Sequence, residues 1–143
     1  VDVGANDLLG HLSSPECSED LDATACRARL DGALAAYAAN LPELLAALRT
    51  AAPDATIVFL LAYNPFSLGS GIAFEQSTSL TLGRLNSIAV TAAGEQDILV
   101  ADGFSPMEGT AAYTTLMLAS PPDIHPNSLG YDVLAQAVVA ALG

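Results

Sequence analysis

Residues 121–132 read Pro-Pro-Asp-Ile-His-Pro-Asn-Ser-Leu-Gly-Tyr-Asp and place a histidine and a carboxylate on a turn stiffened by prolines. Pro126 biases His125 away from helical angles, so we expect the histidine to lie on extended chain. Asn127 or Ser128 can cap a helix that follows. Its apolar positions recur every three or four residues up to the C-terminus: Tyr131, Leu134, Val138 and Leu142. Such a histidine beside an acid suits a general base, although the same pattern also occurs in solvated turns.

The rest of the chain alternates between strand-like and helix-like segments. We expect strands at residues 1–4, 56–63 and 97–101, and helices at 25–51, about 82–94 and from about 128 to the C-terminus. Pro42 is expected to kink or split the first helix. Residues 56–63 form a continuous apolar run, which is typical of a strand buried on both faces of a parallel sheet. Residues 1–143 therefore predict a single α/β domain with a parallel, three-layer αβα arrangement.

The charge of the chain restricts its partners. Sixteen acidic residues stand against four basic ones, which gives a net charge of −12. A surface of this sign repels phosphate backbones and anionic membranes, so the composition argues against nucleic-acid binding. No apolar run approaches the roughly 20 residues that a transmembrane helix needs.

The cysteines carry information about the compartment. Cys17 and Cys26 are the only two, and they flank a stretch rich in Ser, Asp and Glu without the further ligands of a zinc site. We expect a disulfide between them and therefore a secreted or extracytoplasmic protein, with two unpaired thiols as the alternative.

Two short motifs near opposite ends of the chain resemble those of a known family. Gly4-Ala5-Asn6-Asp7 follows the first predicted strand, and Asp123-Ile124-His125-Pro126-Asn127 is followed by Gly130-Tyr131. They resemble, in the same order, the third and fifth sequence blocks of the SGNH (GDSL-type) esterases and lipases, and the resemblance spans residues 1–143. It implies a flavodoxin-like sheet and hydrolysis of a small-molecule ester or lipid by a Ser-His-Asp mechanism. The sequence has no metal-ligand cluster and no phosphate-binding glycine loop, so we expect no cofactor and no metal ion. The alternatives are a non-catalytic, degenerate hydrolase scaffold and a ligand-binding α/β domain.

The resemblance also implies roles for three residues. His125 would be the general base, and Asn6, in a loop at residues 5–9, would donate its side-chain amide to the oxyanion; a plain turn residue is the other reading of Asn6. The family commonly carries its acid three residues before the histidine, where this chain has Pro122. Asp123 is therefore expected to orient His125 from a shifted position, with a backbone carbonyl as the alternative.

The family's nucleophile has no counterpart in this chain. Nothing reads Gly-Asp-Ser, and the nearest imitation of a nucleophile elbow, residues 103–107, has Met107 in place of its second glycine. We therefore expect the serine to lie on a missing N-terminal segment of the same protein. The sheet would then be incomplete at its N-terminal side, and this chain alone would be inactive.

A loop after the second predicted strand supplies candidates for substrate binding. Its residues are Tyr63, Asn64, Pro65 and Phe66. They would either contact the acyl group of the substrate or simply cover the core.

Overall fold

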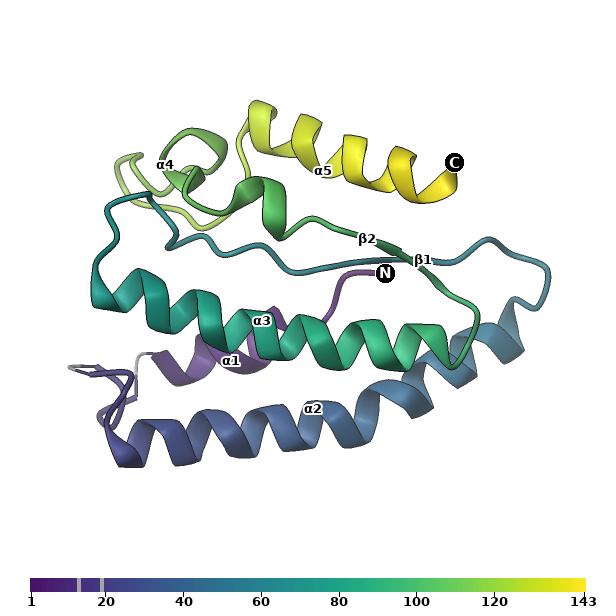
Figure 1. Ribbon diagram of the computed structural model, residues 1–143, viewed down its shortest axis with the longest axis horizontal. Coiled ribbons are helices and arrows are strands. Elements are labelled where there is room, and N and C mark those ends of the chain that lie inside the picture. Colours follow the sequence, from purple (N-terminus) through teal and green to yellow (C-terminus); the bar gives the residue numbers. More distant parts are fainter. Residues whose placement is uncertain (13, 19) are drawn as a thin grey trace.

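Helices lie on both sides of a small central sheet. The computed structural model describes residues 1–12, 14–18 and 20–143. Its elements in chain order are α1 (Ala5–Leu12), α2 (Thr24–Ala51), β1 (Val58–Leu60), α3 (Ala73–Gly94), β2 (Leu99–Ala101), the 3-10 helix η1 (Ser105–Met107), α4 (Ala111–Thr114) and α5 (Ser128–Leu142). In Figure 1 the helices α1, α2 and α3 lie on one side of the strands, and α4 and α5 lie on the other. The chain is thus a mixed α/β structure, as predicted.

The sheet consists of two parallel strands joined through α3. Val58 of β1 lies opposite Leu99 of β2, and Phe59 lies opposite Val100. β1 occupies the centre of the strand predicted at 56–63, and β2 occupies the last three residues of the strand predicted at 97–101, so each is shorter than expected. The described residues form no larger sheet, so a flavodoxin-like arrangement stays a prediction.

The predicted strand at residues 1–4 is not formed, although the segment lies beside β1. Leu60 donates its backbone N–H to the carbonyl of Val1 at 2.8 Å. Beyond that point the hydroxyl of Tyr37 donates a hydrogen bond to the carbonyl of Val3 at 3.1 Å, and Gly4 turns the chain with a φ of 114°. Because this turn leads directly into α1, the backbone pairing with β1 does not extend beyond Val1.

Asn6 lies on a helix, and the prediction of a loop at residues 5–9 was wrong. Leu8, Leu9 and Leu12 recur at helical spacing, and Leu8 is 4% exposed where α1 packs on α2. The segment between α1 and α2 therefore starts after Leu12, and two of its residues, Ser13 and Glu19, lie outside the described residues. His11 is in the last turn of α1.

Helix α2 runs through Pro42 without a break. Its core face carries the buried residues Cys26, Leu30, Leu34, Tyr37, Leu41 and Leu45. In Figure 1 the helix changes direction in its second half, which is the expected effect of a proline inside a helix. The helix is therefore bent rather than split. Near its end the Arg49 guanidinium donates to the carbonyls of Ala55, Gln96 and Asp97 at 2.8 to 3.2 Å, which ties α2 to the segments that precede both strands.

Helix α3 begins at Ala73, well before the predicted start near residue 82. Its first turns are held by a buried carboxylate rather than by apolar side chains. Glu75, 5% exposed, accepts hydrogen bonds from the backbone N–H groups of Leu68 and Gly71 and from the Ser70 hydroxyl. This arrangement fixes the loop between β1 and α3.

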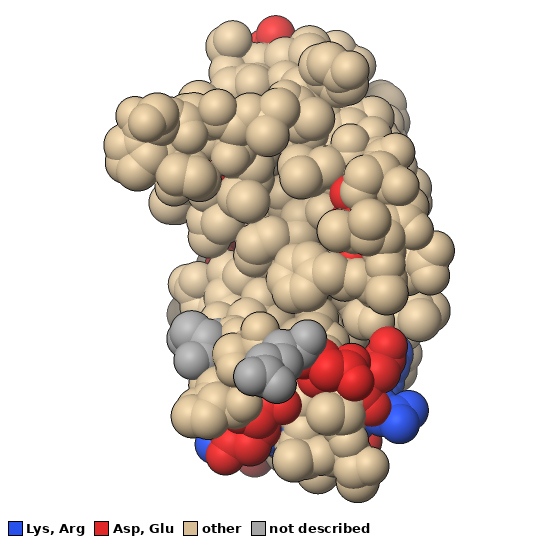
Figure 2. Space-filling model, turned by 90° about the vertical axis from the view of Figure 1, so that its left-hand side faces the viewer, with Lys and Arg blue, Asp and Glu red and all other residues tan. Residues whose placement is uncertain are grey.

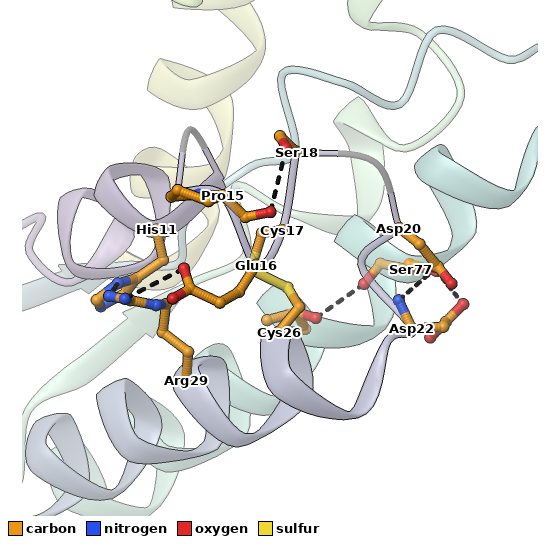
Figure 3. Close-up of a disulfide and its surroundings, with 11 residues drawn as sticks. His11, Pro15, Glu16, Cys17, Ser18, Asp20, Asp22, Cys26, Arg29 and Ser77 are labelled. Atoms are coloured by element: carbon orange, nitrogen blue, oxygen red, sulfur yellow. Dashed lines mark hydrogen bonds and ion pairs between the residues drawn. A yellow bond between two sulfur atoms is a disulfide. The ribbon is translucent and has the colours of Figure 1, made fainter.

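A disulfide joins Cys17 to Cys26 and so fastens the segment after α1 to the first turn of α2. Figure 3 shows it beside the Arg29 guanidinium, which lies 3.2 Å from the carboxylate of Glu16 and 3.5 Å from the ring of His11. The prediction of a disulfide is confirmed. It is compatible with an extracytoplasmic location.

Charge is unevenly distributed over the surface. On the face in Figure 2, acidic side chains gather toward one end, and most of the remaining face carries no charge. Among the described residues, no helix is both long enough and apolar enough to cross a membrane.

Removing the disulfide should destabilise the fold. The bond closes a short loop, so replacing both cysteines by alanine should lower the free energy of unfolding by roughly 2–3 kcal/mol. Urea denaturation of the wild type and the double variant measures the difference. A reducing agent should lower the wild-type midpoint and leave that of the variant unchanged. Equal stability of both oxidised proteins would contradict the prediction.

Candidate active site

The segment that carries His125 is held against residues 113–116 by backbone hydrogen bonds. Leu116 donates its N–H to the His125 carbonyl at 2.9 Å, and Asn127 donates to the Thr114 carbonyl at 3.0 Å. The Asn127 side chain accepts from the N–H of Gly130 at 3.1 Å and thereby caps α5. His125 therefore stands on extended chain between a paired segment and a capped helix, as Pro126 predicts.

Asp123 bonds to His125 in two ways. One carboxylate oxygen lies 2.5 Å from the ring nitrogen Nδ1 and also accepts the backbone N–H of His125 at 2.9 Å. These bonds hold the pKa of Asp123 below its ordinary value of 3.8, through the backbone N–H first and then the ring. Asp123 thus reaches the His125 ring despite the two-residue spacing.

Asn6 and His125 line the same hollow. It has a volume of about 200 Å³, and its walls come from residues 2–6, α1, the segment after β1 and the His125 turn. Asn6 lies in the first turn of α1 and is exposed. Because the N–H groups of a first helical turn have no acceptors within the helix, they add positive potential beside the side-chain amide of Asn6. The structure thus brings together the two residues that the motifs at opposite ends of the chain suggested.

Tyr63 connects the β1 segment to the histidine turn. Its hydroxyl donates to the carbonyl of Ile124 at 2.9 Å, and its ring lines the hollow. Burial, followed by the nearby carboxylate of Asp2, raises the pKa of Tyr63 to about 12. The hydroxyl therefore keeps its proton at neutral pH and holds the turn.

Asp2 is a lining residue that sequence reasoning missed. It lines the hollow with His125, and burial raises its pKa above 3.8. The available signal was a lone carboxylate between two valines at the start of the chain.

The other residues of the predicted substrate loop have different positions. Pro65 lines the hollow, and Phe66 lines an apolar space next to it. Asn64 is fully buried: its amide N–H groups donate to Thr78 and Ser79, and its oxygen accepts the N–H of Phe66. Asn64 therefore holds the loop in shape and does not line the hollow.

The lining of the hollow contains no serine, threonine or cysteine among the described residues. Ser105 begins η1, where Asp102 accepts its backbone N–H at 2.9 Å, and it does not line this hollow. The described residues also contain no group of three or more His, Cys, Asp or Glu side chains that could hold a metal ion. The described part of the site thus combines a histidine, a carboxylate and a carboxamide, and its lining contains no serine, threonine or cysteine.

The structure thus places a histidine bonded to a carboxylate in a hollow that a carboxamide side chain also lines. The sequence model of the GDSL-like Lipase/Acylhydrolase family matches residues 1–133, and the chain belongs to this family of hydrolases. No curated protein and no solved structure shows significant similarity to the chain.

The pKa of Asp123 should depend in part on the His125 ring. Replacing His125 by alanine removes the ring bond but keeps the backbone N–H, so the pKa should rise toward 3.8 without reaching it. In the wild type the carboxylate's interactions are complete above the unfolded value and are lost as pH falls through the lowered pKa. A ¹³C NMR titration of the carboxyl carbon measures both values. His11→Ala is the control and should leave the Asp123 titration unchanged; an identical curve in His125→Ala would refute the ring contact.

Gly130 should be essential to the position of the histidine turn. A Cβ atom there would collide with the Thr114 carbonyl oxygen, so Gly130→Ala should cost roughly 1–3 kcal/mol of stability or more. Gly83, inside α3, has open space around it, and Gly83→Ala should stabilise by roughly 0.5–1 kcal/mol. Thermal or urea unfolding of the pair tests the close contact, and a neutral Gly130→Ala would disprove it.

Proposed function

We propose that this chain supplies the base, the orienting acid and one oxyanion donor of a serine esterase that cleaves carboxylic esters. The observation that carries the proposal is the arrangement of His125, bonded to Asp123, and Asn6 around one hollow. Membership of the GDSL-like Lipase/Acylhydrolase family supports the same reaction class.

The role of His125 follows from which of its two ring nitrogens is hydrogen-bonded to Asp123. Asp123 accepts the proton of Nδ1, so Nε2 is left to take the proton of an attacking serine hydroxyl. Negative charge then develops on the carbonyl oxygen, where the Asn6 amide and the first turn of α1 stabilise it. Protonated His125 next donates to the leaving alcohol, and a water molecule activated by the same ring releases the acid from the acyl-enzyme.

We propose that the serine lies on a segment preceding Val1, on a strand that pairs with the side of residues 1–3 away from β1. Two observations support this position. No nucleophile lines the hollow among the described residues, and on that side no named strand of the described chain pairs with residues 1–3. A strand there would end close to Asn6, because it would run alongside the segment that leads into α1.

Tyr63 and Pro65 are the proposed contacts to the ester, since both line the hollow beside His125. Asn64 would act indirectly, by fixing the shape of the loop, and Phe66 would act through the apolar space next to the hollow. The disulfide supports a proposal that the enzyme works outside the cytoplasm.

Steady-state hydrolysis of p-nitrophenyl acetate by the protein expressed from its full reading frame tests the mechanism. His125→Ala should lower kcat by several orders of magnitude, because the base is lost. Asn6→Ala should lower kcat by roughly 10²–10³-fold with a smaller effect on KM, because the amide acts on the transition state. Both substituted side chains are exposed, so the fold should survive.

Matched controls come from the same chain. His11→Ala and Asn40→Ala replace residues outside the hollow and should retain full activity. A near-normal rate in His125→Ala or Asn6→Ala would remove that residue from the mechanism. Labelling with a fluorophosphonate, read by intact mass, locates the nucleophile: an adduct upstream of Val1 supports the proposal, and no adduct favours a non-catalytic scaffold.

A further inference from the structure

A second, apolar space adjoins the hollow. It is partly open and is lined by leucines of three helices, including Leu8 and Leu12 of α1, Leu30 of α2 and Leu82 of α3, and Phe66 adds a further wall. The open volume inside is about 30 Å³. None of the described residues that line it is charged.

The two threonines of this lining do not make it polar. The Thr78 hydroxyl donates to the carbonyl of Phe74 at 2.9 Å, and that of Thr81 donates to the carbonyl of Ser77 at 2.8 Å. Both hydroxyl protons are therefore used within α3. A space of this kind stays dry and favours an apolar occupant.

The apolar space and the hollow share part of their lining. Ala5, Leu9, Tyr63 and Pro65 line both, and they form the boundary between the two spaces. Asn6 directly follows Ala5, which lines both spaces. An ester carbonyl bound at the Asn6 amide would therefore lie next to the boundary between the two spaces. From there, the apolar end of the acyl group can point either to solvent or into the leucine-lined space.

We infer that the leucine-lined space beneath α1 is an acyl pocket that selects esters of short, unbranched fatty acids. The inference rests on the proposed function, whose hollow holds the ester carbonyl. About 10–15 Å³ is enough for one water-sized sphere, so ~30 Å³ has room for the last one or two carbon atoms of a chain. The pocket therefore sets an upper limit on chain length as well as a preference for an apolar end.

This limit predicts a sharp substrate profile for the protein expressed from its full reading frame. Each methylene group that enters the pocket should raise kcat/KM by roughly tenfold or more, so the butanoate ester should exceed the acetate ester. The octanoate ester should fall below the butanoate ester, because its chain exceeds the ~30 Å³ of open volume in the apolar space.

Two substitutions at the boundary change the pocket in opposite directions. Ala5→Leu fills the passage and should remove the preference for butanoate over acetate. Leu9→Ala widens it and should move the optimum toward the octanoate ester. Leu80→Ala, on α3 at a position 72% exposed, is the matched control and should leave the profile unchanged.

A binding measurement on the chain itself requires no turnover. Butanamide and decanamide are neutral, so the net negative charge of the protein does not repel them. Titrated into methyl-labelled protein, butanamide should shift the NMR signals of Leu8, Leu12 and Leu82, and decanamide should not. Ala5→Leu should abolish these shifts, and Leu9→Ala should allow decanamide to produce them.

The two measurements separate this inference from the proposed function. Leucine shifts with butanamide, together with full ester turnover in His125→Ala, would support the pocket and refute the mechanism. Turnover that depends on His125, with a chain-length profile that neither Ala5→Leu nor Leu9→Ala changes, would overturn the pocket and leave the mechanism intact. Unshifted leucine signals with both amides in the wild type would also overturn it.

Discussion

The candidate site depends on the backbone pairing that holds residues 125–127 beside residues 114–116. The hydrogen bonds from Leu116 to His125 and from Asn127 to Thr114 leave the histidine side chain free and fix its backbone. Gly130 lets α5 approach Thr114 closely, and Tyr63 holds Ile124 from the β1 side. The backbone of the histidine turn is therefore fixed by contacts with residues 114–116, with α5 and with Tyr63, while the His125 side chain stays free. This limits the entropy that the side chain loses when it acts.

Much of this local structure could be predicted from the sequence of the turn itself. Pro126 and Asn127 act on their nearest neighbours, so the extended histidine and the start of α5 followed from backbone sterics and capping. The cores of β1 and β2 and the long helix α2 carried strong apolar patterns, and the two cysteines were close enough in sequence to pair. In each case the signal and the structure it produces lie within one element or its immediate neighbours.

The rest depended on contacts between distant residues. Asn6 was expected on a loop after a strand, whereas the leucine spacing that makes α1 helical gains its energy only against α2. The early start of α3 rests on a buried glutamate that binds a preceding loop, and no apolar periodicity announces it. The position of Asn64 was missed for a related reason: a buried amide with all its partners satisfied looks, in sequence, like an exposed turn residue.

The arginines have a consequence for the behaviour of the chain in solution. Arg29 lies against Glu16, Arg84 lies 2.7 Å from Asp31, and Arg49 is bound to backbone carbonyls. Only four cationic side chains face sixteen acidic ones, so most carboxylates have no cationic partner within the protein. Their mutual repulsion is relieved by dissolved cations, which screen charges beyond roughly 10 Å at 0.1 M salt. The ionic atmosphere therefore contributes to the stability of this fold, and dilute buffer removes that contribution.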